Sequence, residues 1–238
     1  VEYSRKYSKG RKIENVDNPK MSRHIQIESF MSMTGSNADN RILIKPSEQG
    51  SAIIYLYNEI AKLTGAQQIP ALDLNAKAKK SISALAAELA GAKGKSLIVS
   101  GSNNVSEQII INKINSVLGN FGSTIDFTEA SLQRQGNESD LFTLINDINN
   151  NKVDAVIFLE ANPLFDFSGK AKLKAALSKV KTKISLSYSL DETGSECDMI
   201  APGSHMLESW GDAMPKKGHY SLMQPVISTI FNTRQPEL

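Results

Sequence analysis

The sequence predicts an α/β fold: a doubly wound, mostly parallel, Rossmann-like sheet with helices on both faces and irregular N- and C-terminal segments. Two observations lead to this prediction. From residue 50 to about 190, stretches with the apolar period of helices alternate with short apolar runs typical of strands. The run at 153–160 is apolar at successive positions, which suits a parallel sheet covered on both faces.

Five stretches carry the helical pattern. The first places Leu56 and Ile60 on one face and is stopped by Gly65. The third begins with Asn104 and Glu107, which have the spacing of a capping box. The predicted helices are residues 51–65, 76–94, 103–120, 139–149 and 171–180.

Apolar runs between these helices predict strands. They are residues 97–100, 124–127, 154–159 and 184–187, and we predict that all four are parallel strands of one sheet. Residues 197–202 are a candidate for a short fifth strand. No internal repeat is expected from the sequence.

This pattern divides the chain into three parts. Residues 1–49 are predicted to be an irregular N-terminal segment with a basic, solvated opening. Residues 50–201 form the Rossmann-like domain, and residues 202–238 form an extended segment packed on it. Valine rather than methionine at position 1 predicts that the sequence is a segment of a longer polypeptide.

Composition excludes several classes of function. The 27 basic and 25 acidic residues leave a net charge of +2, which is too small to predict nucleic-acid binding. No apolar run approaches the roughly 20 residues that cross a bilayer, so direct membrane insertion is not expected. The single cysteine, Cys197, cannot form a four-cysteine site, and His205 and His219 lack a partner motif. We therefore predict no metal ion and no iron–sulfur cluster in this segment.

Ligands of doubly wound sheets bind beyond the carboxyl ends of the strands, where three turns are expected: 100–104, 160–169 and 190–198. Small residues in the first turn would let a phosphate approach a helix N-terminus, but ordinary turn and cap chemistry uses the same residues. The turn lacks the GxGxxG spacing, and the chain has no Walker A motif or nucleophile elbow. No catalytic residue is predicted.

The stretch 202–225, "PGSHMLESWGDAMPKKGHYSLMQP", contains the only tryptophan. A large aromatic side chain can anchor an irregular segment, so we expect Trp210 to be mostly buried against the α/β domain. Glu208 and Asp212 are expected to accept backbone amides and to hold the turn at Gly211. The alternative role for this stretch is contact with a cofactor or a partner.

Three stretches in this chain resemble a known family. "RHIQIESFMSMTGSNADNRILIKPSE" (23–48), "LEANPLFDF" (159–167) and "DETGSECDMIAPGSHMLESWGDAMPKKGHYSLMQPVI" (191–227) are similar to segments of molybdopterin oxidoreductases, in the same order. The likeness is greatest to the molybdopterin-like, iron–sulfur large subunit of alternative complex III, a quinol:electron-acceptor oxidoreductase. The resemblance implies that the partners of this chain are other subunits of a membrane-attached respiratory complex. It also implies that the parent protein binds iron–sulfur clusters and is located at the periplasmic face of a bacterial inner membrane.

The resemblance also assigns cofactor positions. In cofactor-bearing relatives the matching turns hold a molybdopterin guanine dinucleotide. The equivalent positions here are Gly101, Ser102, Asn103, Asn162, Pro163, Glu192 and Thr193. Glu160 and Ala161 replace the usual glycine before Asn-Pro, and no molybdenum ligand can be placed.

These departures imply a cofactor-free scaffold beside iron–sulfur domains. We expect its three turns to form a cleft with the shape of a cofactor site but no bound cofactor. The alternative is the genuine molybdopterin guanine dinucleotide-binding part of an active molybdenum oxidoreductase. A generic nucleotide-binding module is a third interpretation.

Overall fold

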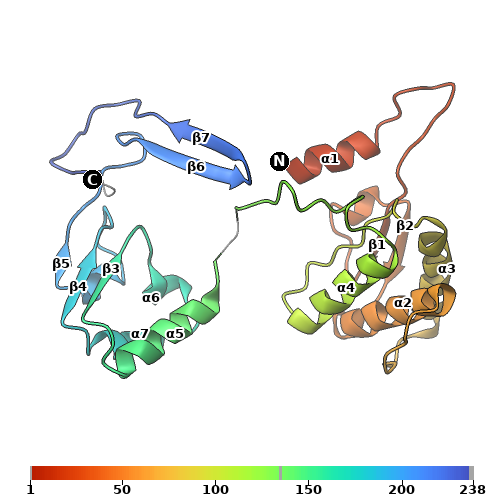
Figure 1. Cartoon of the computed structure of the whole chain (residues 1–238), viewed down its shortest axis with the longest axis horizontal. Coiled ribbons are helices and arrows are strands. Elements are labelled where there is room, and N and C mark those ends of the chain that lie inside the picture. Colours follow the sequence, from red (N-terminus) through yellow and green to blue (C-terminus); the bar gives the residue numbers. More distant parts are fainter. Residues whose placement is uncertain (1, 134–135, 236–238) are drawn as a thin grey trace. The chain divides into compact units, whose positions relative to one another are not determined.

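The computed structural model describes residues 2–133 and 136–235, which form two compact units, Val1–Phe127 and Thr128–Leu238 (Figure 1). Both units combine helices with small sheets, most of them parallel, so the predicted α/β class is confirmed. The boundary between the two units, after Phe127, lies within residues 50–201, which the sequence predicts to be one domain. The three-part division of the chain stays a prediction.

The first unit contains a two-stranded parallel sheet. Strand β1 (Ile25–Glu28) pairs with β2 (Asn40–Leu43), and Ile25 lies opposite Asn40. Ile42 is buried and joins the core, whereas its neighbour Leu43 is 66% exposed. The sheet therefore has one packed face and one open face in this unit.

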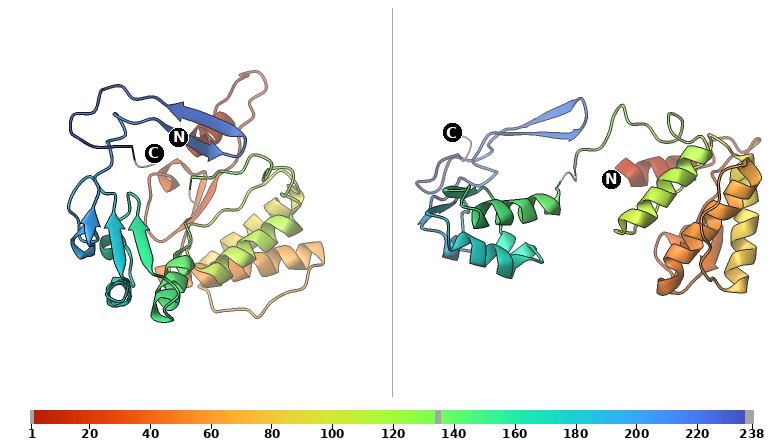
Figure 2. Two further views of the ribbon diagram at one scale, coloured as in Figure 1. Left: turned by 60° about the vertical axis from the view of Figure 1, so that its left-hand side comes forward. Right: turned by 60° about the horizontal axis from the view of Figure 1, so that its bottom comes forward.

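Three long helices complete the first unit (Figure 2): α2 (Gln49–Thr64), α3 (Ala76–Gly91) and α4 (Val105–Val117). All three match predicted helices. Helix α2 ends at Gly65, whose φ of 76° is a left-handed cap that glycine adopts without steric cost. The helices bury an aliphatic core that includes Leu56, Ile60, Ile82 and Ile114.

The first 49 residues contain more regular structure than expected. Helix α1 (Glu2–Gly10) opens the chain, and two single 3₁₀ turns follow, η1 (Gly35–Asn37) and η2 (Pro46–Glu48). Long stretches between these elements are irregular, as predicted. The side chain of Arg11 joins this segment to the β1–β2 sheet through hydrogen bonds to Ser22 O and Asp39.

The prediction of strands at 97–100 and 124–127 is wrong. Neither stretch forms a strand, and the second makes only an isolated bridge between Phe121 and Ile125. The physical reason is visible at Ile98. The buried amide of Asn115 accepts from Ile98 N at 3.1 Å and donates to Ile98 O at 2.8 Å. The Asn115 side chain therefore forms the hydrogen bonds to Ile98 that the backbone of a neighbouring strand would otherwise form.

The second unit holds a three-stranded parallel sheet in the order β3-β4-β5. Its strands are β3 (Ala155–Phe158), β4 (Thr182–Ser185) and β5 (Met199–Ile200). The predicted strands at 154–159 and 184–187 and the short fifth strand are confirmed as parallel neighbours.

Helices cover one face of this sheet. They are α5 (Glu138–Asn149), the short α6 (Pro163–Asp166) and α7 (Lys170–Leu177), and a 3₁₀ turn, η3 (Gly194–Glu196), precedes β5. Phe158 of β3 packs among the helices, but Ile157 on the other face is 62% exposed. Within this unit, β3 is therefore covered on one face only.

The C-terminal part forms an antiparallel ribbon of β6 (Gly211–Lys216) and β7 (His219–Met223), turned at Gly218 with φ of 80°. The prediction that Trp210 is mostly buried is wrong, because its side chain is 54% exposed. A two-stranded ribbon offers little surface to cover an indole ring. Glu208 does accept backbone amides as expected, from His205 and Ile230.

Candidate functional site

The expected site residues of the second unit meet where β3 ends and η3 begins. The side-chain oxygen of Asn162 accepts hydrogen bonds from Thr193 N at 3.2 Å and Thr193 Oγ1 at 2.7 Å. Thr193 Oγ1 in turn accepts from Leu164 N at 3.1 Å. Thr193 is fully buried, so these bonds satisfy a hydroxyl that water cannot reach.

Glu192 closes this network from the solvent side. Asn162 Nδ2 donates to Glu192 Oε2 at 2.7 Å. This hydrogen bond lowers the pKa of the Glu192 carboxyl below its ordinary value, and the positive charge of Lys170 adds to the effect. The carboxylate is therefore ionised at neutral pH. The resemblance predicts that it lies at a position equivalent to the family's cofactor site.

Pro163 and Glu160 shape the turn around Asn162. Pro163 is the first residue of α6, where its missing N–H costs no helical hydrogen bond. Glu160 has a φ of 47°, in the left-handed region that residues with a Cβ rarely adopt. The glycine that the resemblance predicts here would adopt that conformation without strain, so glutamate at this position has a conformational cost.

The backbone N–H groups at the junction already have acceptors. Phe165 N and Asp166 N donate to Asn162 O at 3.0 Å each. On the other side, Gly194 N donates to Asp191 Oδ1 at 2.6 Å, and Ser195 N donates to Asp191 O at 2.9 Å. A phosphate needs such amides as donors. The amides of α6 and η3 are therefore a poor fit to a pyrophosphate.

The remaining expected site residues, Gly101, Ser102 and Asn103, lie in the first unit, ahead of α4. Ser102 N donates to Ser100 Oγ, and the side chain of Gln108 donates to Ser102 O at 2.6 Å. The turn is thus held by its own polar groups. The expected single cleft of three turns stays a prediction, because these turns belong to two different compact units.

Asn104 caps α4 as predicted, by accepting from Ser106 N at 2.9 Å. The reciprocal half of the capping box does not form. Instead, the Glu107 carboxylate accepts from Gln49 Nε2 at 3.0 Å and joins α4 to the start of α2. The cap was readable from the sequence, but the partner of Glu107 is 58 residues away.

The structure reveals an internal repeat that the sequence analysis missed. The pattern Thr-Gly-Ser-x-x-Asp occurs at 34–39 and again at 193–198, so a shift of 159 residues relates the two copies. Each copy forms a 3₁₀ turn between two parallel strands. The shift also relates the strand registers, because Ile25 pairs with Asn40 and Ile184 pairs with Met199.

The aspartate of each copy makes the same two contacts. Asp39 accepts from His24 N at 2.7 Å through its carboxylate, and its own N–H donates to His24 O at 2.9 Å. Asp198 makes the same two bonds with Lys183, at 2.7 and 2.9 Å. This repeat could have been found in the sequence from the six-residue pattern. It was missed because the two copies are 159 residues apart, far beyond the range of local periodicity.

A cation neutralises each aspartate. Arg11 forms two hydrogen bonds to Asp39, at 2.6 and 3.0 Å, and lowers the pKa of that carboxyl to about 2. In the second copy Lys183 bonds to Asp198 at 3.0 Å and lowers its pKa. These ion pairs hold the turns, and sequence reasoning singled out none of the four residues.

The first copy also contains a buried carboxylate, Glu28. Glu28 accepts from Ser32 Oγ at 2.7 Å and from Arg41 Nε at 2.5 Å, and its side chain is 8% exposed. The Ser32 hydrogen bond is the main cause that lowers the pKa of Glu28. A Cβ at Gly35 would overlap this carboxylate, so the turn requires glycine there.

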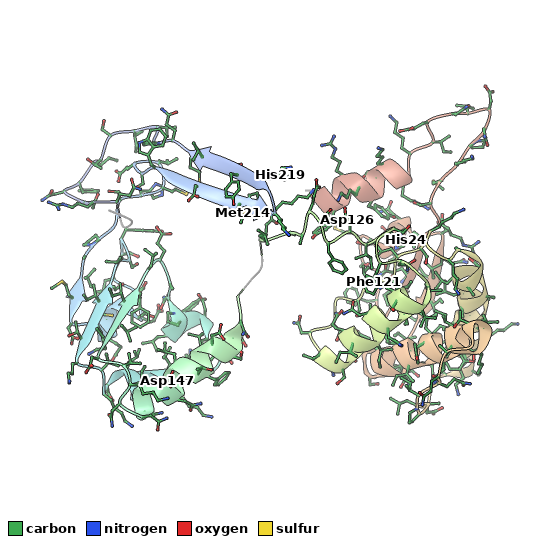
Figure 3. The ribbon with its side chains drawn as sticks, viewed as in Figure 1. His24, Phe121, Asp126, Asp147, Met214 and His219 are labelled. Atoms are coloured by element: carbon green, nitrogen blue, oxygen red, sulfur yellow. The ribbon has the colours of Figure 1, made fainter. Side chains whose placement is uncertain are left out.

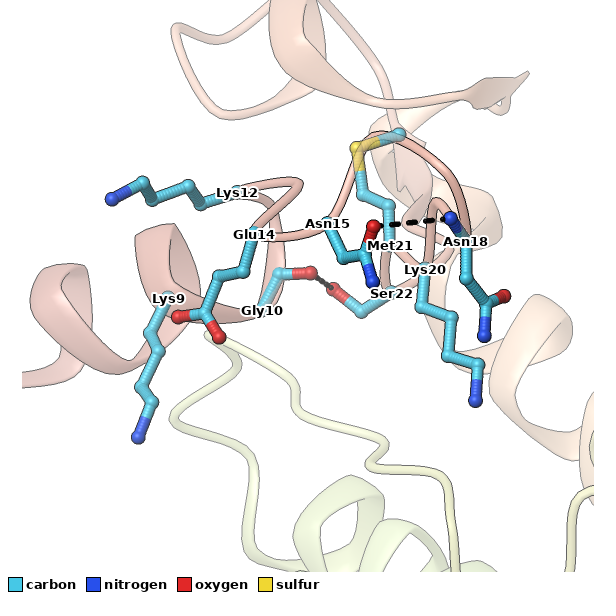
Figure 4. A pocket seen from close by; sticks show the side chains of 9 residues that line it. All are labelled: Lys9, Gly10, Lys12, Glu14, Asn15, Asn18, Lys20, Met21 and Ser22. Atoms are coloured by element: carbon cyan, nitrogen blue, oxygen red, sulfur yellow. Dashed lines mark hydrogen bonds between the residues drawn. The ribbon is translucent and has the colours of Figure 1, made fainter.

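A cavity of about 550 Å³ lies in the N-terminal loop and is lined by Lys9, Lys12, Lys20 and neighbouring polar residues (Figure 4). Its lysine side chains point in different directions and do not meet at one point. The cavity therefore has no common anion site. We assign it no function.

Histidines do not gather into a metal site in the described part of the chain. His24, labelled in Figure 3, lies 2.9 Å from the Tyr7 hydroxyl and 3.1 Å from Gln26 Oε1. Across residues 2–133 and 136–235, no group of three His, Cys, Asp or Glu side chains is placed to hold a metal ion. The absence of metal from this segment stays a prediction. No described helix has the length and apolar character needed to cross a bilayer.

Comparison with known proteins gives two findings. Residues 8–236 match the molybdopterin oxidoreductase family. The chain is also 34% identical, over 84 residues, to the menaquinone reductase molybdopterin-binding-like subunit of Nitratidesulfovibrio vulgaris (strain Hildenborough). The matched part is 34% of this chain and 12% of that relative, so the chain aligns with a small fraction of the relative's length.

Proposed function

This chain belongs to the molybdopterin oxidoreductase family, and we propose that it serves as a cofactor-free scaffold in an oxidoreductase subunit of a respiratory complex. The observation that carries this proposal is the closed network at the β3–η3 junction. The Asn162 side-chain oxygen accepts from Thr193, and its side-chain nitrogen donates to Glu192. The residues that would hold a cofactor use their side-chain polar groups to form hydrogen bonds with one another.

The electrostatics of the junction support the same proposal. A pyrophosphate brings about two negative charges and would meet the ionised Glu192 carboxylate. Like charges 4 Å apart repel by roughly 4 kcal/mol at an effective dielectric constant of about 20. That repulsion offsets several good hydrogen bonds. The residues at the junction therefore do not fit a guanine dinucleotide.

The respiratory context of the proposal rests on the matched relative. That protein is named as a subunit of a menaquinone reductase. By analogy, we propose that this chain assembles with other subunits of a membrane-attached complex on the periplasmic face, and that iron–sulfur domains of its parent protein carry the electrons. Exposed apolar side chains such as Trp210 and Leu222 offer contact area for such partners.

Calorimetric titration with GDP and GTP tests the scaffold proposal. We expect no binding tighter than about millimolar, which corresponds to about −4 kcal/mol. A matched pair of variants isolates the junction: Glu192→Gln removes the carboxylate and keeps the shape, and Asn162→Ala removes the turn's anchor. Micromolar binding by the wild type that Asn162→Ala abolishes would overturn the proposal. Gain of binding in Glu192→Gln alone would support the electrostatic argument.

The retained Asn162–Pro163 turn favours a second candidate, the cofactor-binding part of an active molybdenum oxidoreductase. Molybdenum and pterin analysis of the native complex separates the two candidates. Stoichiometric molybdenum and pterin bound to this subunit would establish the second candidate. Their absence, together with retained electron transfer, is the result that the scaffold proposal predicts.

A further inference from the structure

Strand β1 has one paired edge and one open edge. Among the described residues it pairs only with β2. On the β2 side, Glu28 O accepts from Ile44 N at 3.2 Å. Successive residues of a parallel strand direct their backbone groups to opposite edges, so the N–H and C=O of Ile25 and Ile27 face away from β2.

The second copy of the repeat shows what such an edge binds. Its central strand β4 corresponds to β1, and β3 lies along the edge that is open in the first copy. Thr182 N donates to Asp154 O at 3.3 Å, and Leu186 N donates to Phe158 O at 2.9 Å. The 159-residue shift relates Leu186 to Ile27. Ile27 N therefore occupies the place of a donor that is paired in the other copy.

The first copy also has the side chains and the helix that a further parallel strand requires. Ile25 and Ile27 pack against the core of the first unit, so an added apolar strand would extend a sheet that already has a covered face. Parallel neighbours are joined by a crossover, usually a helix. In the second copy α6 and α7 join β3 to β4, and in the first copy α1 precedes β1 in the same chain order.

We infer that the open edge of β1 is a docking site for a parallel, apolar β-strand carried by the same polypeptide ahead of α1. This strand would lie on β1 as β3 lies on β4 and would give both copies the same three-stranded order. The inference rests on the repeat and the register, and it is independent of whether the junction at Asn162 binds a cofactor. A partner chain or a second copy of this chain are the competing occupants.

The test is to supply a strand of known behaviour. Residues 153–162, which hold β3 and its turn, are fused directly ahead of Val1 of the full chain, and amide hydrogen exchange is measured residue by residue. We expect the amides of Ile25 and Ile27 to exchange about tenfold more slowly, or slower still, in the fusion. Gln26 and Glu28, whose amides face β2, should change little.

A fusion in which the added copy carries Val156→Pro is the matched control, because residues 154, 156 and 158 direct their backbone groups to the paired edge and proline removes the N–H there. It should leave Ile25 and Ile27 as fast as in the unfused chain. Three results would overturn the inference: no slowing in the wild-type fusion, equal slowing in the proline control, or slow exchange of Ile25 and Ile27 in the unfused chain. If the slow exchange of the unfused chain depended on protein concentration, a second copy would be the occupant.

Discussion

At the residue scale, two positions depart from their ordinary conformation or charge state for identifiable reasons. Glu160 adopts a left-handed backbone where the family usually has glycine. Asp39 keeps its charge well into the acid range because Arg11 and the His24 N–H both bind its carboxylate. Neither property follows from local sequence, since one depends on a turn geometry and the other on a contact 28 residues away.

Glu160→Gly is expected to stabilise the protein. A left-handed conformation costs a residue with a Cβ roughly 1–2 kcal/mol, and the greater freedom of glycine in the unfolded chain offsets part of the gain. We expect a net increase of about 0.5–1 kcal/mol in the free energy of unfolding, measured by urea denaturation. Glu160→Ala removes the same carboxylate but keeps the Cβ, so an equal gain in that variant would assign the effect to charge instead of conformation.

Asp39 is expected to make stability depend on pH in the acid range. Its pKa falls from an ordinary value of 3.8 to about 2 on folding, so its contribution is complete above about pH 4 and is lost as the pH falls towards 2. Thermal unfolding of the wild type and Asp39→Asn should differ most near neutral pH and converge at about pH 2. A difference that stays constant across this range would contradict the argument.

At the element scale, the two Thr-Gly-Ser turns show how one short pattern builds the same structure twice. Each turn closes with its glycine N–H bonded to an upstream side chain, Ser32 in the first copy and Asp191 in the second. The copies differ in crowding. A Cβ on Gly35 would overlap the Glu28 carboxylate, whereas a Cβ on Gly194 would lie 3.2 Å from Asp191 Oδ1.

Gly35→Ala should therefore destabilise the protein more than Gly194→Ala does. Overpacking in a closely packed site costs roughly 1–3 kcal/mol, and the buried, ion-paired Glu28 has little room to move. Gly101→Ala is the control, because a Cβ there has no neighbour within 4 Å. Chemical denaturation of the three variants checks the order, and an equal loss in all three would show that crowding at Glu28 has no effect.

At the scale of the whole molecule, two units share one kind of parallel strand–turn–strand motif, and the ribbon of β6 and β7 extends from the second. Apolar side chains stay exposed on both units, including Phe30 and Met33 before the first turn and Tyr220 on the ribbon. Such exposure is typical of surfaces that other protein segments cover. It agrees with the proposal of a subunit within a larger assembly.

Trp210→Ala should have little effect on the stability of this chain. A side chain that is 54% exposed loses less buried area than a core aromatic, so we expect a loss below about 1 kcal/mol. Denaturant unfolding followed by far-ultraviolet circular dichroism measures this without relying on the tryptophan signal. A loss of about 3 kcal/mol or more, the range for buried aromatics, would mean that the indole is packed in solution.

The sequence by itself determined the local elements and the family. Five helices and three of the parallel strands lie where their periodicity, caps and glycine stops predict, because these signals act over a few residues. The family stretches also identified Asn162, Glu192 and Thr193, which the structure brings into one hydrogen-bonded junction.

Only the tertiary structure decided how backbone groups and charges are paired over long distances. The sequence around Ile98 predicts a strand, but the buried side chain of Asn115, 17 residues away, forms hydrogen bonds with the Ile98 backbone. Trp210 reads as an anchor, yet no core forms around it in the ribbon. Arg11 reads as part of a solvated tail, but it binds Asp39. For Ile98 and Arg11 the deciding partner is remote in sequence. Hydrogen bonds and burial depend on which segments meet in space, and local patterns do not specify this.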